Sequence, residues 1–174
     1  MYHKLSGSKH IFLILYVDDT LFATNDKKIL QETKRFLSKK FEMKDLGEAS
    51  FVLGIQTYQN RPRGILGLSQ KTYIEKVLER YGMQDCKPRD TPVAKGEKFS
   101  LSQCPKNDLK FKEIQKIPYA STVGSLMYAQ VCTRPDITFI VGMLGRYLSN
   151  LEIDHWREVK RFFRYLQRTK DTHI

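Results

Sequence analysis

Two adjacent carboxylates, Asp18 and Asp19, are the side chains of this sequence with the clearest capacity for chemistry. They lie between two β-prone segments, residues 11–16 and 20–24, so the sequence predicts a β-hairpin with the aspartates at its turn. At pH 7 their like charges repel each other unless a cation lies beside them. Hard oxygen ligands of this kind favour Mg²⁺ or Mn²⁺. We therefore expect a metal-binding turn; the alternative is an ordinary solvent-facing turn.

Carboxylates that share divalent ions with substrate phosphates are typical of nucleotidyl transfer. In a site with two ions, one ion activates a hydroxyl nucleophile and the other stabilises the leaving pyrophosphate. A tight hairpin suits this chemistry because it fixes both carboxylates on rigid strands beneath the reacting phosphate.

The segments after this hairpin predict one helix, a second hairpin and another helix. Asn25 and Asp26 are suitable N-caps for a helix over residues 27–41, whose apolar residues form one stripe. Extended segments at 50–58 and 64–68 flank a loop with Asn and Pro, which predicts the second hairpin. The next helix is predicted to have Ser69 as its N-cap and to end at Gly82.

The second half of the chain is predicted to be helical after an irregular connection. Residues 83–117 are polar with scattered apolar positions, which predicts a long loop. Helical periodicity follows in residues 119–130, 136–148 and 152–168. Arginines recur at helical spacing on one side of the last helix: Arg157, Arg161, Arg164 and Arg168. This arginine stripe is either a phosphate-binding surface or simply a solvated face.

Composition and charge indicate a folded basic protein. The chain has 174 residues, 41% of them hydrophobic, and a formal net charge of +11, so nucleic acid or an anionic membrane is a natural partner. The longest apolar run, residues 11–17, is too short to span a bilayer, and no secretory signal is expected. Three widely spaced cysteines, at 86, 104 and 132, favour free thiols in a reducing compartment.

Five short motifs, in order along nearly the whole chain, resemble reverse transcriptases of the copia retrotransposon type. Leu15-Tyr16-Val17-Asp18-Asp19 is similar to the Y-x-D-D signature of reverse transcriptases. The other matching segments are Met43-Lys44-Asp45-Leu46-Gly47-Glu48 with Phe51-Val52-Leu53-Gly54-Ile55, then Leu68-Ser69-Gln70-Lys71-Thr72-Tyr73-Ile74, Val123-Gly124-Ser125-Leu126-Met127-Tyr128, and Thr133-Arg134-Pro135-Asp136-Ile137.

The resemblance implies an α+β fold: a partial polymerase palm of antiparallel hairpins plus a helix, followed by a helical thumb and connection region. It implies a partial palm over residues 1–68, a thumb-like helix and irregular connection over 69–117, and a helical connection toward a ribonuclease H region over 118–174. The ligands implied are Mg²⁺ or Mn²⁺, an RNA/DNA template-primer and deoxynucleoside triphosphates. The implied location is intracellular, in cytoplasmic virus-like particles or in the nucleus.

Individual roles also follow from the resemblance. Asp18 and Asp19 correspond to catalytic metal ligands, with Asp18 the more direct, and Tyr16 to a neighbour of the primer end. Lys44 corresponds to a region near the incoming triphosphate, where it would stabilise pyrophosphate or donate a proton; the alternative is a solvated lysine. Leu53 and Gly54 would lie in the hairpin that supports the primer; the alternative is a bulge in an ordinary strand.

The resemblance also implies that parts of the polymerase are absent. A third metal-binding carboxylate and the fingers lie upstream in that family, yet residues 1–17 contain neither Asp nor Glu. The ribonuclease H carboxylates are expected downstream. We therefore expect this chain alone not to polymerise DNA. Three hypotheses remain: a fragment of a polymerase, a module that binds nucleic acid without catalysis, and a protein whose basic surface is merely solvated.

Overall fold

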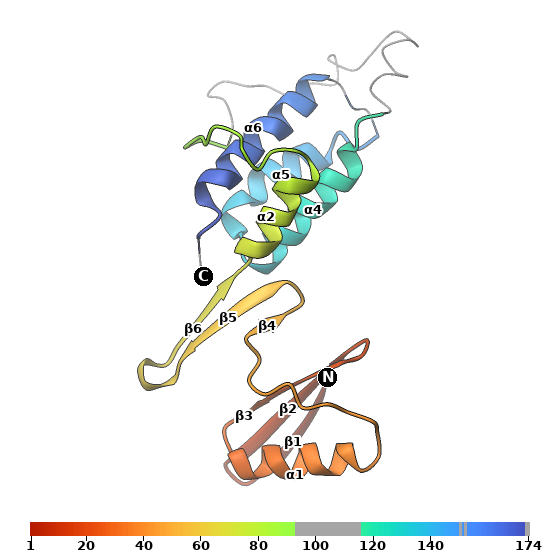
Figure 1. The fold of residues 1–174 in the computed structure, drawn as a ribbon, viewed down its shortest axis with the longest axis vertical. Coiled ribbons are helices and arrows are strands. Elements are labelled where there is room, and N and C mark those ends of the chain that lie inside the picture. Colours follow the sequence, from red (N-terminus) through yellow and green to blue (C-terminus); the bar gives the residue numbers. More distant parts are fainter. Residues whose placement is uncertain (93–115, 150, 152, 173–174) are drawn as a thin grey trace. The chain divides into compact units, whose positions relative to one another are not determined.

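The computed structural model describes residues 1–92, 116–149, 151 and 153–172 and divides into two compact units (Figure 1). The first unit comprises residues 1–49 and the second residues 50–174. Within the described residues there are two three-stranded antiparallel sheets and five α-helices. The expected α+β class is confirmed.

The first unit is an antiparallel meander of β1 (Tyr2–Ser6), β2 (Lys9–Tyr16) and β3 (Asp19–Thr24). The predicted hairpin of β2 and β3 is confirmed. Strand β1 was not predicted, because its mostly polar residues are all exposed and lack the alternation of a half-buried strand. It pairs with the outer edge of β2 from Tyr2 opposite Leu13 to Ser6 opposite Lys9, so that edge is not open to other chains.

Helix α1 (Lys27–Ser38) follows β3 and contacts both β2 and β3. Asp26 is its N-cap, as predicted, and its carboxylate accepts a hydrogen bond from the Ile29 N–H at 2.9 Å. Lys9 forms an ion pair with Asp26 at 2.8 Å. The lysine and the capping N–H together hold the pKa of Asp26 below its usual value. The helix ends three residues before the predicted position, residue 41.

The first unit buries little apolar surface of its own. Among its residues only the hydrophobic side chain of Ile11 is buried. Ile14, Leu15, Tyr16 and Phe36 are between 41% and 62% exposed. A sheet and a helix this exposed resemble part of a larger layered fold, because stable layers bury the apolar face of each element against another.

The second unit begins with β4 (Phe51–Val52), β5 (Ile55–Asn60) and β6 (Ile65–Ser69). The predicted second hairpin, β5 with β6, is confirmed. The predicted first strand over residues 50–58 is wrong in detail, because the chain reverses between β4 and β5. A 3₁₀ turn (Arg61–Arg63), capped by the Asn60 side chain, joins β5 to β6.

The helices of the second unit pack around one hydrophobic core. They are α2 (Lys71–Arg80), α4 (Tyr119–Cys132), α5 (Thr138–Gly145) and α6 (Ile153–Thr169), with a 3₁₀ turn (Pro135–Ile137) before α5. All four predicted helices exist. The core includes Ile74, Leu78, Val123, Leu126, Val141, Leu144, Val159 and Phe163.

The ends of two helices differ from their predicted positions. Helix α2 ends as predicted: Gly82 has φ +62°, and the Met83 N–H reaches back to the Leu78 carbonyl at 2.7 Å, which is a Schellman arrangement. Its N-cap, however, is Gln70 and not Ser69. The predicted helix over 136–148 is a 3₁₀ turn followed by the shorter α5. The predicted start of the last helix, Glu152, lies outside the described residues.

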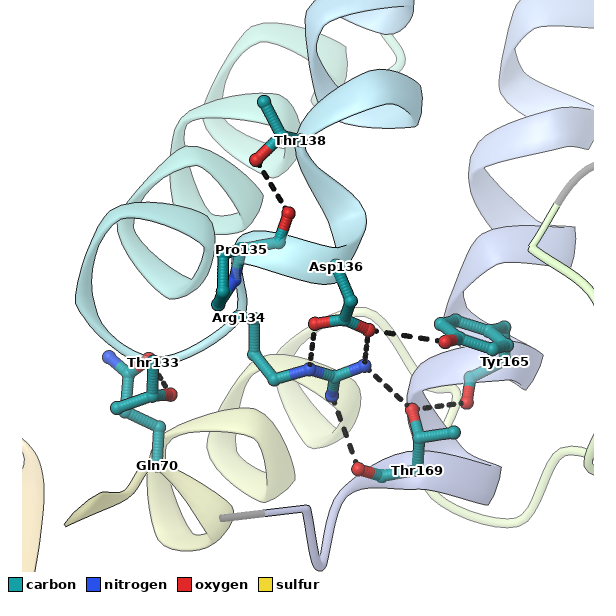
Figure 2. Close-up of polar contacts among 8 residues, drawn as sticks. All are labelled: Gln70, Thr133, Arg134, Pro135, Asp136, Thr138, Tyr165 and Thr169. Atoms are coloured by element: carbon teal, nitrogen blue, oxygen red, sulfur yellow. Dashed lines mark hydrogen bonds and ion pairs between the residues drawn. The ribbon is translucent and has the colours of Figure 1, made fainter. Parts of the chain in front are cut away.

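A buried arginine ties the loop after α4 to the end of α6 (Figure 2). The Arg134 side chain is 1% exposed and donates two parallel hydrogen bonds to Asp136, at 2.8 Å and 2.7 Å. It also donates to the backbone carbonyl of Thr169 at 3.2 Å and to its hydroxyl at 2.9 Å. Tyr165 donates to the same carboxylate at 3.1 Å. We call these four residues the Arg134 clasp.

Two further expectations concern membranes and thiols. In the described part of the chain, no helix combines the length and the apolar character needed to cross a bilayer. Cys86 and Cys132 are free thiols, as predicted. Cys104 lies outside the described residues, as does most of the predicted 83–117 loop. The described portions of that loop, residues 83–92 and 116–117, contain neither helix nor strand.

Candidate catalytic turn and nucleic-acid interface

The two aspartates lie at the end of the β2–β3 hairpin, as predicted. Tyr16 pairs with Asp19, so Val17 and Asp18 alone form the turn and Asp19 begins β3. Val17 has φ +50°, whereas Asp18 does not have a positive φ. A positive φ at only the first central residue is the mark of a type II′ turn, whose twist matches that of the flanking strands.

Val17 adopts this backbone conformation at a cost. Positive φ is a genuine outlier for a β-branched residue and costs on the order of 1–3 kcal/mol. The Val17 side chain is 86% exposed, so packing within the described residues does not offset the cost. Strain of this kind concentrates at functional sites, and here it lies directly beside the two carboxylates.

Asp18 and Asp19 are both exposed, and Tyr16, across the strand pair from Asp19, is 55% exposed. Adjacent exposed carboxylates on a rigid turn suit a hard divalent cation that keeps most of its water or phosphate ligands. Among the described residues, no group of three or more His, Cys, Asp or Glu side chains could hold a metal ion. Within the described residues, the turn therefore presents a pair of carboxylates that no third such side chain joins.

Lys44 lies in the same unit, in a loop that is attached to α1. The neighbouring Asp45 accepts hydrogen bonds from the Lys34 ammonium at 2.7 Å and from the Gly47 N–H at 3.0 Å. These two hydrogen bonds hold the pKa of Asp45 below its usual value, and the one from Lys34 has the larger effect. Lys44 itself is exposed. The loop thus has a defined attachment one residue away from Lys44.

Leu53 and Gly54 form a second two-residue turn, between β4 and β5. Val52 pairs with Ile55, and both turn residues have positive φ, +52° and +78°, as a type I′ turn requires. The alternative of a bulge is therefore wrong. Leu53 is 42% exposed, and a Cβ on Gly54 would meet nothing within 4 Å. Nothing in the described structure crowds Gly54, so only its backbone conformation calls for glycine.

The arginine stripe of α6 is only partly open. The Arg157 and Arg168 side chains are 71% and 63% exposed, and each pairs with an acidic side chain: Arg157 with Asp154 at 2.6 Å, and Arg168 with Asp90 at 3.2 Å. Arg161 is 24% exposed and lies 3.8 Å from Glu158, while Arg164 is half-buried. Two arginines therefore remain accessible to a phosphate that displaces their acidic partners.

Two structurally prominent side chains were not predicted from the sequence. Arg134 belongs to a quoted motif, but no local signal showed that it would be buried. Tyr128 donates a hydrogen bond to the Leu53 carbonyl, 75 residues away in the chain. Such a contact has no signature in periodicity or spacing. The predicted site residues fall into two units, Tyr16, Asp18, Asp19 and Lys44 in the first and the rest in the second.

Comparison with known proteins places these features in one family. Residues 1–95 match the family model described as reverse transcriptase (RNA-dependent DNA polymerase). The chain is 46% identical over 168 residues to the retrovirus-related Pol polyprotein from transposon TNT 1-94 of Nicotiana tabacum, covering 97% of this chain and 13% of the polyprotein. It is 36% identical to that from transposon RE2 of Arabidopsis thaliana, covering 95% of this chain and 11% of the polyprotein.

A shorter relative is a putative transposon Ty5-1 protein of Saccharomyces cerevisiae. The identity is 31%, over 98% of this chain and 53% of the yeast protein. No solved structure matches the chain. The chain spans about an eighth or less of the two plant polyproteins and about half of the yeast protein. It belongs to the reverse transcriptase family of RNA-dependent DNA polymerases, in the branch of copia-type retrotransposon Pol polyproteins.

Proposed function

We propose that this chain is the part of an RNA-directed DNA polymerase that carries the metal-binding turn. The observation that supports the proposal is the two-residue turn between Tyr16 and Asp19, which presents two exposed carboxylates beside a strained Val17. Mg²⁺ or Mn²⁺ bound there would supply the charge that activates a primer hydroxyl and stabilises the leaving pyrophosphate. Asp18, at the tip, is the direct ligand, and Asp19 completes the pair.

The remaining first-unit residues would orient the reactants. Tyr16, half-exposed beside Asp19, contacts the end of the primer. Lys44 lies on the loop attached through Asp45 to α1 and reaches the triphosphate, where an ammonium stabilises the pyrophosphate or donates a proton to it. In this proposal residues 1–68 correspond to part of the palm. Residues 69–117 correspond to a thumb-like helix and connection, and residues 118–174 to the connection toward ribonuclease H.

The second unit would hold the template-primer. The turn of Leu53 and Gly54 supports the primer backbone, and the arginine stripe of α6 contacts phosphates. Contacts to phosphates do not depend on base sequence, and the net charge of +11 favours them at long range. This suits an enzyme that copies any template. The proposed location is intracellular, in virus-like particles of the cytoplasm or in the nucleus, where the free thiols Cys86 and Cys132 would stay reduced.

The isolated chain is expected to show no template-dependent DNA synthesis. Two carboxylates without a third metal ligand among the described residues do not position two ions for in-line displacement. The measurement is primer extension on an RNA template with Mg²⁺ and then with Mn²⁺, using an active reverse transcriptase as the positive control. Template-dependent products that disappear on Asp18→Asn substitution would show instead that this chain carries a complete catalytic site.

A second candidate function is binding of nucleic acid without catalysis, and the ion pairs of α6 favour it. Arg157 and Arg168 are accessible but are held by Asp154 and Asp90. A phosphate that replaces these carboxylates would form stronger charge-assisted hydrogen bonds to the same guanidinium groups. This surface needs no metal ion.

Salt titration of RNA–DNA hybrid binding tests the arginine stripe. Replacing Arg157 and Arg168 by alanine is expected to weaken binding and to reduce the slope of log K against log salt by roughly 1–2, because about one counterion is released per phosphate contact. Asp154→Asn should strengthen binding by releasing Arg157. The control is Glu32→Gln, which makes the same charge change at an exposed position on α1. Equal effects of Asp154→Asn and Glu32→Gln would mean that the stripe is merely solvated.

A further inference from the structure

The turn between β4 and β5 is attached to the helices by two tyrosines whose rings are in edge-on contact. The Tyr128 hydroxyl, on α4, donates a hydrogen bond to the Leu53 backbone carbonyl. The Tyr128 ring lies edge-on to the ring of Tyr73 on α2, with centroids 4.9 Å apart and planes at 68°. Tyr73 in turn donates to the Ser125 carbonyl of α4 at 3.0 Å. Burial, the largest influence on Tyr73, raises its pKa, so its hydroxyl stays a neutral donor.

This attachment acts on the turn of a short hairpin. Strand β4 contributes two ladder pairs, at Phe51 and Val52, and one more backbone hydrogen bond runs from the Thr57 N–H to the Ser50 carbonyl at 2.9 Å. Leu53 also has positive φ, +52°, which is costly for a residue with a side chain. The hydrogen bond from Tyr128 is made to the carbonyl of this strained residue. The hydrogen bond therefore restrains the residue of the turn whose backbone conformation is strained.

We propose that Tyr128 is a positioning residue for the primer strand. Its hydroxyl fixes the Leu53–Gly54 turn relative to α4 and α2, so that a nucleic-acid strand lying on the turn has a set position relative to the helices. This inference rests on the proposed primer-supporting role of that turn. It assigns the role to a residue that does not itself contact the nucleic acid, because the hydroxyl is already used by the Leu53 carbonyl.

Tyr128→Phe isolates the hydroxyl. The phenyl ring keeps its edge-on contact with Tyr73, whose own hydrogen bond to Ser125 is unchanged, so the helical core should remain intact. The matched control is Tyr81→Phe. Tyr81 also joins α2 to α4, through a 3.2 Å hydrogen bond to the Ser121 hydroxyl, but that bond does not involve the turn.

Amide hydrogen exchange of the free protein tests the attachment itself. In Tyr128→Phe, the amides of residues 52–56 should exchange about fivefold faster, since loss of one hydrogen bond costs about 1 kcal/mol and the opening is local. In Tyr81→Phe those amides should exchange as in the unaltered chain. Unchanged exchange in Tyr128→Phe overturns the inference, whatever the nucleic-acid results are.

Binding of two RNA–DNA hybrids, one with a recessed DNA 3′ end and one blunt, tests the positioning role. The unaltered chain should prefer the recessed end, and Tyr128→Phe should reduce that preference by about threefold to tenfold while binding the blunt hybrid equally well. A merely structural role would weaken both hybrids in parallel and would overturn the inference. If the unaltered chain does not prefer the recessed hybrid, both the primer role of the turn and the inference about Tyr128 are wrong. If Tyr128→Phe keeps the full preference for the recessed hybrid, only the inference about Tyr128 is wrong.

Discussion

Replacing Arg134 by alanine is expected to lower the free energy of unfolding of the helical unit by about 2–4 kcal/mol, because a buried side chain and its hydrogen bonds are lost, while the remaining partner Asp136 is 42% exposed and regains water. The guanidinium group is 1% exposed and makes four hydrogen bonds, to Asp136 and to Thr169. Its loss leaves the Thr169 carbonyl at the end of α6 and the Asp136 carboxylate without that donor. A cavity also remains where the side chain was.

The measurement is urea unfolding followed by tryptophan fluorescence. Trp156 is the only tryptophan of the chain and packs against the helical core from α6, so its signal reports on the second unit. Arg134→Lys should recover little stability, since an ammonium cannot form the two parallel bonds to Asp136. The control Arg146→Ala removes an exposed arginine and should change stability by less than about 0.5 kcal/mol. If Arg134→Ala lowers the free energy of unfolding no more than Arg146→Ala does, the Arg134 clasp does not stabilise the helical unit.

The same clasp predicts a dependence on pH. Arg134, first as hydrogen-bond donor and then as a charge, holds the pKa of Asp136 below its usual value. The carboxylate therefore stabilises the fold fully above its ordinary pKa of about 4. That contribution is lost as the pH falls from there through the lower pKa of the folded state. In Asp136→Asn the acid-dependent part of the Trp156 unfolding curve should be smaller.

Replacing Asp18 and Asp19 together by asparagine is expected to abolish the response of the hairpin to divalent cations. In the unaltered chain, Mn²⁺ should broaden the amide signals of residues 16–20 in NMR spectra, because the paramagnetic ion binds the two exposed carboxylates. Amides are far weaker ligands for a hard cation than carboxylates. The double variant should therefore keep sharp signals at the same Mn²⁺ concentration.

Hybrid binding by the double variant should persist or strengthen, since two negative charges are removed without loss of a phosphate contact. The control is Glu32→Gln with Glu42→Gln, which makes the same charge change at two exposed positions of the first unit and should leave the Mn²⁺ broadening intact. Equal broadening of these signals in both double variants, or no broadening in the unaltered chain, would contradict the proposal that Asp18 and Asp19 bind a divalent ion.

The local parts of this protein could be predicted from its sequence. The hairpin with Asp18 and Asp19 at its turn, the Asp26 N-cap and the Gly82 helix end all depend on residues within a few positions of one another, where propensity and capping operate. The apolar periodicity of α2, α5 and α6 likewise predicted their buried faces, because helical spacing alone determines which side chains share a side.

Contacts between distant segments were decided only by the tertiary structure. Strand β1 is too polar to predict by pattern and forms because β2 offers an unpaired edge. The reversal at Leu53 and Gly54 follows a strand of only two residues, and the Leu53 carbonyl accepts a hydrogen bond from Tyr128, 75 residues away. Periodicity placed four arginines on one side of α6, but packing then half-buried two of them and gave the other two acidic partners. Sequence spacing determines which face a residue occupies, whereas burial and pairing depend on what the rest of the chain brings against that face.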